Sequence, residues 1–139
     1  MSRLVSHALI LCAVLATGAC GSSNVTPTSP TPTPPATVTE TFSGTINRNG
    51  AMTHAFLAQA SGGVTATLAV LAPENVTSIG VSLGTWNGSA CATVIANDNA
   101  AQGAVVVGLT SSAGNLCVRV YDVGKIGNLA SYELTVVHP

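Results

Sequence analysis

Apolar residues recur at every second position through most of the last hundred residues of the chain. The alternation is clearest in residues 64–70, 79–83, 116–121 and 131–136, where Val, Leu, Ile and Tyr alternate with Thr, Gly, Ser, Arg or Glu. A period of two places one face of a β-strand in a core and the other toward solvent. We find no comparable 3.6-residue period in this region, so it is predicted to be all-β.

Turn-forming residues separate the alternating stretches. Clusters of Asn, Gly, Asp, Ser and Pro occur at intervals, among them Asn97-Asp98-Asn99. Short strands at this spacing are typical of a two-sheet antiparallel β-sandwich. The predicted strands are 40–46, 52–59, 63–72, 76–85, 91–96, 103–110, 115–122 and 130–137.

The charge of this region excludes one class of partner. Only 6% of the chain is charged, and residues 40–139 carry three basic against five acidic side chains, a net charge of −2. Nucleic-acid binding needs a basic surface that neutralises phosphates. We therefore expect no nucleic-acid partner.

Residues 1–19 have the three zones of an export signal. Arg3 gives a positive start, residues 8–16 are apolar, and Thr17-Gly18-Ala19 supplies small residues before a cleavage site. The apolar run is about half the roughly 20 residues that a membrane-spanning helix needs. We therefore interpret residues 1–19 as a signal peptide and predict that the protein is exported.

Cys20 follows this leader in a setting that resembles a bacterial lipobox, although Thr17 stands where Leu is usual. The alternative is an ordinary signal-peptidase site after Ala19. Cysteine pairing favours lipidation, because Cys20 is the odd one once Cys12 is removed with the leader and the other two pair. An Asp directly after the lipidated cysteine would resemble an inner-membrane retention signal, but Gly21 stands at that position. We therefore predict a lipid anchor in the bacterial outer membrane.

Residues 20–39 are predicted to be an unstructured tether. The segment is rich in Thr and Ser and contains Pro27, Pro30, Pro32, Pro34 and Pro35. Proline removes backbone donors, which disfavours helix and sheet and favours an extended polyproline-II-like chain. The alternative is a glycosylated, mucin-like stalk. The domains are then the signal peptide at 1–19, the anchor and tether at 20–39, and the sandwich at 40–139.

Cys91 and Cys117 are predicted to form a disulfide, since exported proteins fold in an oxidising compartment. Closing a loop of this length stabilises a domain by about 3 kcal/mol in the chain-entropy treatment. Because Val118 and Val120 should face the core, Cys117 should face the other way. We expect the bond on a sheet surface or at its edge, unlike the core disulfide of immunoglobulin domains.

Trp86, Arg119 and Tyr121 are the candidate binding residues. Arg119 and Tyr121 fall on the face assigned to solvent, and Trp86 lies near a turn. Exposed aromatic residues beside Arg are a common way to stack on sugars or seat a partner. The alternative is that both aromatic rings simply shield the ends of the sandwich.

Several stretches together resemble a known bacterial domain. Residues 42–46, 53–56 and 63–68 look like the opening strands, and residues 114–121 and 132–136 like the closing pair, of the pre-peptidase C-terminal domain. The resemblance covers nearly all of residues 40–137. It implies a jelly-roll-like β-sandwich, which in that family accompanies secreted proteases and sometimes binds collagen or polysaccharide, in some cases with calcium. The acidic residues of such calcium sites are largely missing here.

Two catalytic or metal-binding interpretations compete with the binding one. Residues 80–84 read Gly-Val-Ser-Leu-Gly, which matches the nucleophile elbow of serine hydrolases, and Asp98 or Asp122 and then His138 follow in hydrolase order. An elbow needs a strand-to-helix turn, whereas Ser82 lies within an alternating strand, and His138 is expected to fray as the penultimate residue.

The histidines offer no metal-ligand spacing, and His54 is expected to point to solvent or lie at a sheet edge. Asn97-Asp98-Asn99 is interpreted as a turn and not as a calcium loop. We thus predict neither metal nor cofactor.

The sequence favours a non-catalytic, lipid-anchored module of the cell envelope whose partners are the membrane and an envelope protein or glycan. The main alternative is a carbohydrate- or matrix-binding sandwich, and a small serine hydrolase using Ser82 is a distant third.

Overall fold

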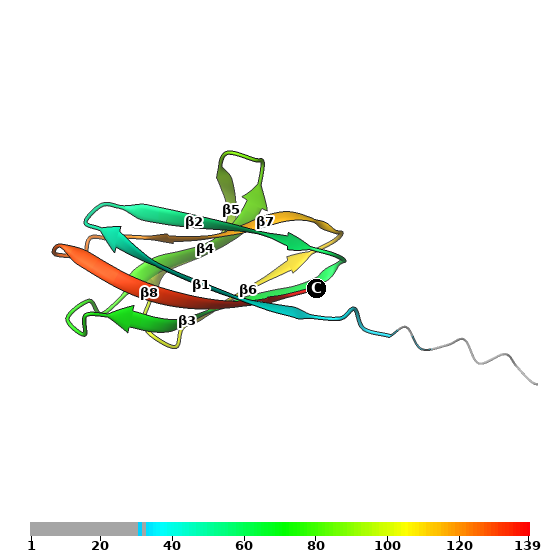
Figure 1. The fold of residues 1–139 in the computed structure, drawn as a ribbon, viewed down its shortest axis with the longest axis horizontal. Helices are drawn as coiled ribbons and strands as arrows, with labels where there is room; N and C mark the ends of the chain where they lie inside the picture. Colours follow the sequence, from blue (N-terminus) through cyan, green and yellow to red (C-terminus); the bar gives the residue numbers. More distant parts are fainter. Residues whose placement is uncertain (1–30, 32) are drawn as a thin grey trace, which may run out of the picture. The chain divides into compact units, whose positions relative to one another are not determined.

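The computed structural model describes residue 31 and residues 33–139 (Figure 1). The predicted signal peptide, Cys20 and most of the predicted tether lie outside these residues. Residues 33–37 are exposed and belong to neither a helix nor a strand, and the first strand begins at Val38. In this part of the chain no helix has the length and apolar character needed to cross a membrane.

Residues 33–139 form a β-sandwich without helices, and each of the eight predicted strands is present. The strands are β1 (Val38–Asn47), β2 (Ala51–Ala58), β3 (Gly62–Ala72), β4 (Ile79–Trp86), β5 (Cys91–Ala100), β6 (Val105–Thr110), β7 (Gly114–Tyr121) and β8 (Leu129–His138).

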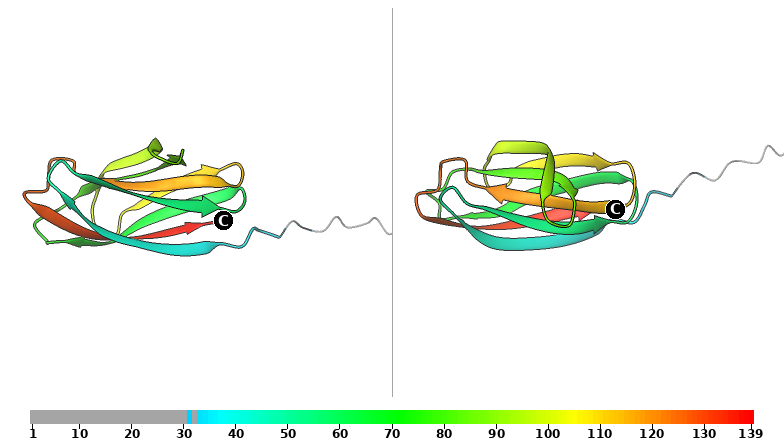
Figure 2. Two further views of the ribbon diagram at one scale, coloured as in Figure 1. Left: turned by 45° about the horizontal axis from the view of Figure 1, so that its top comes forward. Right: turned by 90° about the horizontal axis from the view of Figure 1, so that it is seen from above.

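The described strands make two antiparallel sheets of four, in the orders β1-β8-β3-β6 and β2-β7-β4-β5. Successive strands therefore alternate between sheets except at the β4–β5 hairpin, and the last strand returns beside the first. This is the connectivity of a jelly roll. Figures 1 and 2 show the sheets as two layers, with β1 and β8 in one and β2 and β7 in the other. The predicted fold class is confirmed.

The core lies between the two layers and follows the predicted alternation. Val118 and Val120 of β7 are fully buried, as are Leu134 and Val136 of β8 opposite. Leu68 of β3 completes the centre of the core. Burial of such side chains contributes about 1.5–3 kcal/mol each relative to leaving them exposed, which makes this alternation the main determinant of the fold.

One predicted turn is wrong. Asn97-Asp98-Asn99 lies inside β5, which continues to Ala100 opposite Ile79. The register shifts between Ile79 and Val81, so an extra residue of β5 is accommodated as a bulge. Asn97 Oδ1 accepts a hydrogen bond from Asn99 N (2.9 Å), which is the local bond of an Asx turn, but the chain does not reverse there.

The chain reverses instead after Ala100. Gly103 has φ 86°, a left-handed conformation that favours glycine, and Ala104 N bonds to Ala101 O (2.9 Å). Strand β4 also begins at Ile79 and not at residue 76, because residues 76–78 belong to the loop that follows Pro73.

Candidate functional site

The Gly-Val-Ser-Leu-Gly motif lies in the middle of strand β4, between β7 and β5. Val81 and Leu83 point into the core, so Gly80, Ser82 and Gly84 face the outer side of the sheet. Ser82 is nevertheless 0% exposed, and its Oγ lies 3.4 Å from Thr93 Oγ1. This outer face is therefore covered by a second layer of residues and does not present a serine to solvent.

The ring of Tyr121 covers one end of this stripe. A side chain at Gly80 would overlap that ring, so the absence of a Cβ lets Tyr121 pack directly on the β4 backbone. Tyr121 Oη donates a hydrogen bond to Asp98 Oδ1, and the guanidinium of Arg119 lies 5.4 Å from the ring centroid. Burial, followed by the bond to Asp98, raises the pKa of Tyr121 to about 12. The phenol thus stays protonated and acts as a donor at neutral pH.

The disulfide covers the other end. Cys91 of β5 and Cys117 of β7 are bonded, with 5.8 Å between their Cα atoms. Strand β4 lies between these two strands, which would separate them by about 9–10 Å in a flat sheet. The start of β5 must therefore leave the sheet plane and fold over its outer face, and Figure 1 shows the β4–β5 hairpin rising from the layer.

Gly84 makes this hairpin position possible, because a side chain there would collide with the backbone of Ala92. The predicted disulfide is confirmed, and it lies on an outer sheet surface with Cys117 fully buried beneath the hairpin.

The predicted binding residues divide into two groups. Arg119 and Tyr121 lie together on the outer face of β7, where Arg119 is exposed and Tyr121 half-buried. Trp86 is half-buried at the opposite end of β4, beside the hairpin and opposite Cys91. The structure brings Arg119 and Tyr121 together but does not add Trp86 to the same patch.

The four residues of the serine-hydrolase interpretation are also dispersed. Ser82 is on the covered face of β4, and the carboxylate of Asp98 accepts a hydrogen bond from Tyr121. Asp122 holds a loop, since its carboxylate accepts hydrogen bonds from the backbone amides of residues 124–126 and of Asn49. His138 lies in the other sheet, on β8.

The expectation that His138 frays is wrong. It is 1% exposed, because β8 is a central strand and His138 is paired with Val38 of β1. Its Nε2 lies 3.0 Å from Glu40 Oε1, and its ring packs on Phe56 with 4.8 Å between centroids. The last strand is therefore held in place to its end by hydrogen bonding and ring packing.

A row of aromatic and histidine rings closes the side of the sandwich where β1 and β2 form the sheet edges. His54, on edge strand β2, stacks on Phe42 with 4.9 Å between centroids, and its Nε2 lies 2.7 Å from Tyr132 Oη. Phe56 and His138 continue the row. Burial lowers the pKa of His54, which favours the neutral ring. His54 does lie at an edge, as expected, and its half-buried ring packs against other rings.

The opposite side, where β5 and β6 form the edges, remains open. Five of its apolar side chains are exposed, most of all Leu109 at 88% and Val94 at 77%, with Ile95, Val105 and Val107 near half. We call these five residues the open rim. Monomeric proteins seldom gather exposed apolar residues in this way except at interaction sites.

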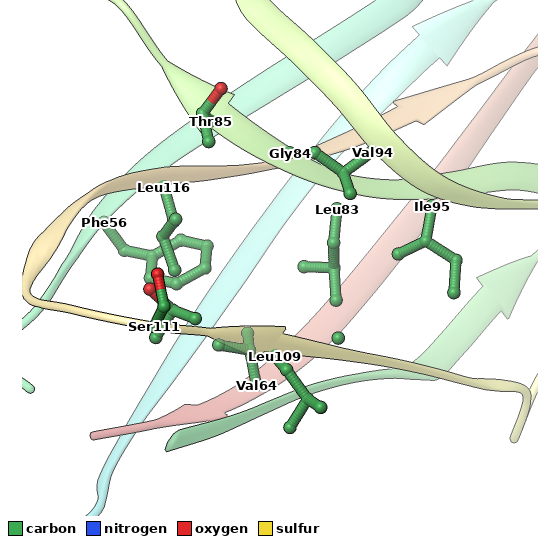
Figure 3. Close-up of a pocket in the computed structure, with 12 residues that line it drawn as sticks. Phe56, Val64, Leu83, Gly84, Thr85, Val94, Ile95, Leu109, Ser111 and Leu116 are labelled. Carbon is green, nitrogen blue, oxygen red and sulfur yellow. The ribbon is translucent and has the colours of Figure 1, made fainter. Parts of the chain in front are cut away.

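A cavity of about 190 Å³ opens beside the open rim. Phe56, Val64, Leu83 and Leu116 are among its lining residues, and Figure 3 shows Leu83 and Ile95 pointing across it toward β6. The lining is mainly apolar, so the cavity suits an apolar side chain or a short aliphatic group. Sequence reasoning missed this feature, although outward Val105, Val107 and Leu109 stand where alternation would place polar residues.

Among the residues that the structure describes, no three His, Cys, Asp or Glu side chains are grouped so that they could hold a metal ion. No protein-family model matches this chain, and a search of curated proteins finds no match either.

Proposed function

We propose that this chain is an exported, lipid-anchored protein of the cell envelope whose β-sandwich is a non-catalytic interaction module. The open rim is the observation that carries the proposal. Exposed apolar residues on two neighbouring edge strands, with an apolar cavity between the sheets beside them, are the features of a surface that a partner covers.

The contrast between the two sides of the sandwich supports this interpretation. At the β1/β2 side, ring side chains fill the space between the two sheets: Phe42, His54, Phe56, Tyr132 and His138. This side of the sandwich is therefore closed by residues of the chain itself. At the β5/β6 side the five residues of the open rim are aliphatic and exposed. Their burial would contribute about 25 cal/mol per Å² of apolar area removed from water. A partner can supply that burial.

The anchor is proposed from the sequence alone. A signal-like leader ending at Cys20, followed by a Pro- and Thr-rich tether, would hold the module near a bacterial membrane, which we propose is the outer membrane. Kinship with the pre-peptidase C-terminal domain is likewise a proposal that rests on strand patterning.

A carbohydrate-binding function has weaker support. Sugar stacking needs a free aromatic face, but the ring of Tyr121 packs on Gly80 and has the guanidinium of Arg119 over it. Trp86 is the remaining candidate ring on this sheet. A hydrolase has less support still, since Ser82 is buried in mid-strand.

Site-specific photo-crosslinking in intact cells tests the proposed surface. A photoreactive residue replacing Leu109 should give defined adducts, whereas one replacing Thr41, which is exposed on edge strand β1, should not. No adduct at Leu109, or equal adducts at both positions, would contradict the proposal.

Labelling with a palmitate analogue tests the anchor separately. The wild-type chain should incorporate the label and a Cys20→Ser chain should not. Equal labelling of the two chains would refute the assignment of Cys20.

A further inference from the structure

Strand β6 is an edge strand without the usual protection against pairing. Natural edge strands are blunted by charged residues, prolines or bulges. Residues 105–110 read Val-Val-Val-Gly-Leu-Thr, with no charge and no proline, and β6 pairs with β3 without a register shift. Edge strand β1 carries Glu40, and edge strand β5 carries Asp98 and pairs irregularly with β4. Edge strand β2 also lacks charge and proline, but its side of the sandwich is closed by the row of rings that includes His54.

The free backbone groups of β6 belong to the same residues whose side chains are exposed. Ala104 O accepts a hydrogen bond from Leu68 N of β3 (2.9 Å). Backbone groups alternate in direction along an antiparallel strand, so those of Val105, Val107 and Leu109 point to the open edge. Their side chains lie on the outer face, because Val106 between them is buried.

The edge is complementary to itself. In an antiparallel pair of two β6 strands centred on Val107, that residue opposes its own copy and Val105 opposes Leu109 of the other chain. All three exposed side chains then meet apolar partners, and cross-strand pairs of this kind stabilise sheets. A charged edge would repel its copy, whereas β6 carries no charge.

We propose that β6 is the contact through which two copies of this chain pair, giving a continuous sheet of eight strands related by a two-fold axis. This inference names the partner at the surface described under Proposed function and rests on that function. A single strand pair is a small interface, of the weak and transient class. Tethering both copies to one membrane raises their effective concentration and compensates for that weakness.

Cysteine crosslinking of the full chain in its own envelope, under mild oxidation, tests this register. Val107→Cys should give a reducible dimer on a non-reducing gel, because directly opposed residues have Cα atoms about 5.5 Å apart or less, within disulfide range. Val105→Cys is the matched control on the same strand and face, since two copies of residue 105 would lie about 13 Å apart along the strands.

The expected result is a strong dimer for Val107→Cys, little for Val105→Cys or the wild-type chain, and a crosslink between Val105→Cys and Leu109→Cys chains expressed together. Equal dimer from Val107→Cys and Val105→Cys, or none from either, overturns the inference. If Leu109 still crosslinks to a different protein in that case, the proposed function stands and only the identity of the partner is wrong.

Discussion

Replacing Gly84 by alanine should destabilise the protein because the backbone of the hairpin packs directly against this position. The added Cβ would overlap the carbonyl oxygen of Ala92 and lie 2.7 Å from its carbonyl carbon and 3.0 Å from Thr93 Cα. These are backbone atoms, and the neighbouring Cys91 is bonded to Cys117. The clash therefore has to be relieved by moving the strand or the hairpin.

The magnitude follows from two opposing effects. Gly→Ala at an unstrained position usually stabilises by about 0.4–1 kcal/mol through the unfolded state. Overpacking costs typically about 1–3 kcal/mol. Because the colliding atoms are backbone, we expect the upper part of that range and a net loss of about 2 kcal/mol. For a domain of about 100 residues that lowers the Tm by roughly 10 °C.

Urea unfolding of the purified protein measures this loss, with Gly63→Ala as the matched control. Gly63 is also in a strand, but a Cβ there meets nothing within 4 Å, so alanine should leave stability unchanged or raise it by up to about 1 kcal/mol. Reducing the disulfide should diminish the penalty at Gly84, since the hairpin can then move away. Equal stability of the Gly84→Ala protein and the wild type would refute the packing explanation of the motif.

Three further perturbations test the layer over β4 and the loop beside it. Replacing Cys91 and Cys117 together by serine should cost about 3 kcal/mol in urea unfolding, because the loop that they close is released; an unchanged midpoint would contradict this. Tyr121→Phe keeps the ring but removes the hydrogen bond to Asp98, so we expect a loss of about 1 kcal/mol, and no loss would mean that the bond contributes nothing. Hydrogen bonds from the amide of Asn49, and then from those of residues 124–126, lower the pKa of Asp122 below 3.8 in the folded protein. The ionised carboxylate therefore stabilises the folded protein above pH 3.8, and this stabilisation is lost as the pH falls through the pKa of the folded state. Asp122→Asn should therefore be less stable than the wild type at pH 7, with the difference shrinking toward pH 2 in thermal unfolding scans; a difference independent of pH would argue against this role.

The strands and the fold class could be predicted from the sequence because alternation is a local signal. The alternation within a stretch such as residues 116–121 is enough to predict which side chains point inward. Burying these side chains requires a second sheet to pack against the first, which gives the two layers. The location of the disulfide on a sheet surface was predictable for the same reason, since inward Val118 and Val120 force Cys117 outward. The turn assigned to Asn97-Asp98-Asn99 failed because a bulge and a turn use the same residue types, and only the pairing with β4 distinguishes them.

The candidate site was less predictable because it depends on contacts between distant residues. No local pattern indicates that Tyr121 covers Gly80 or that the hairpin folds over Gly84. From the sequence alone, the glycines of residues 80–84 could therefore be assigned to a nucleophile elbow and not to these close contacts. The row of rings that includes Phe42 and His54 likewise joins strands in different sheets. One signal of the open rim is present in the sequence, because Val105, Val106 and Val107 are consecutive and at least one of them must be exposed. Interpreting this signal requires knowing that β6 is an edge strand.

Solvent accessibility of the open rim in its native setting is the most direct test of the account. Single Leu109→Cys and Thr41→Cys chains would be treated with a hydrophilic maleimide, both as purified protein and in the isolated envelope, and their labelling rates compared. We predict that residue 109 reacts much more slowly in the envelope than in the purified protein, while residue 41 reacts at the same rate in both. Unchanged labelling of residue 109 in the envelope would mean that nothing covers this side of the sandwich, and would contradict the central claim.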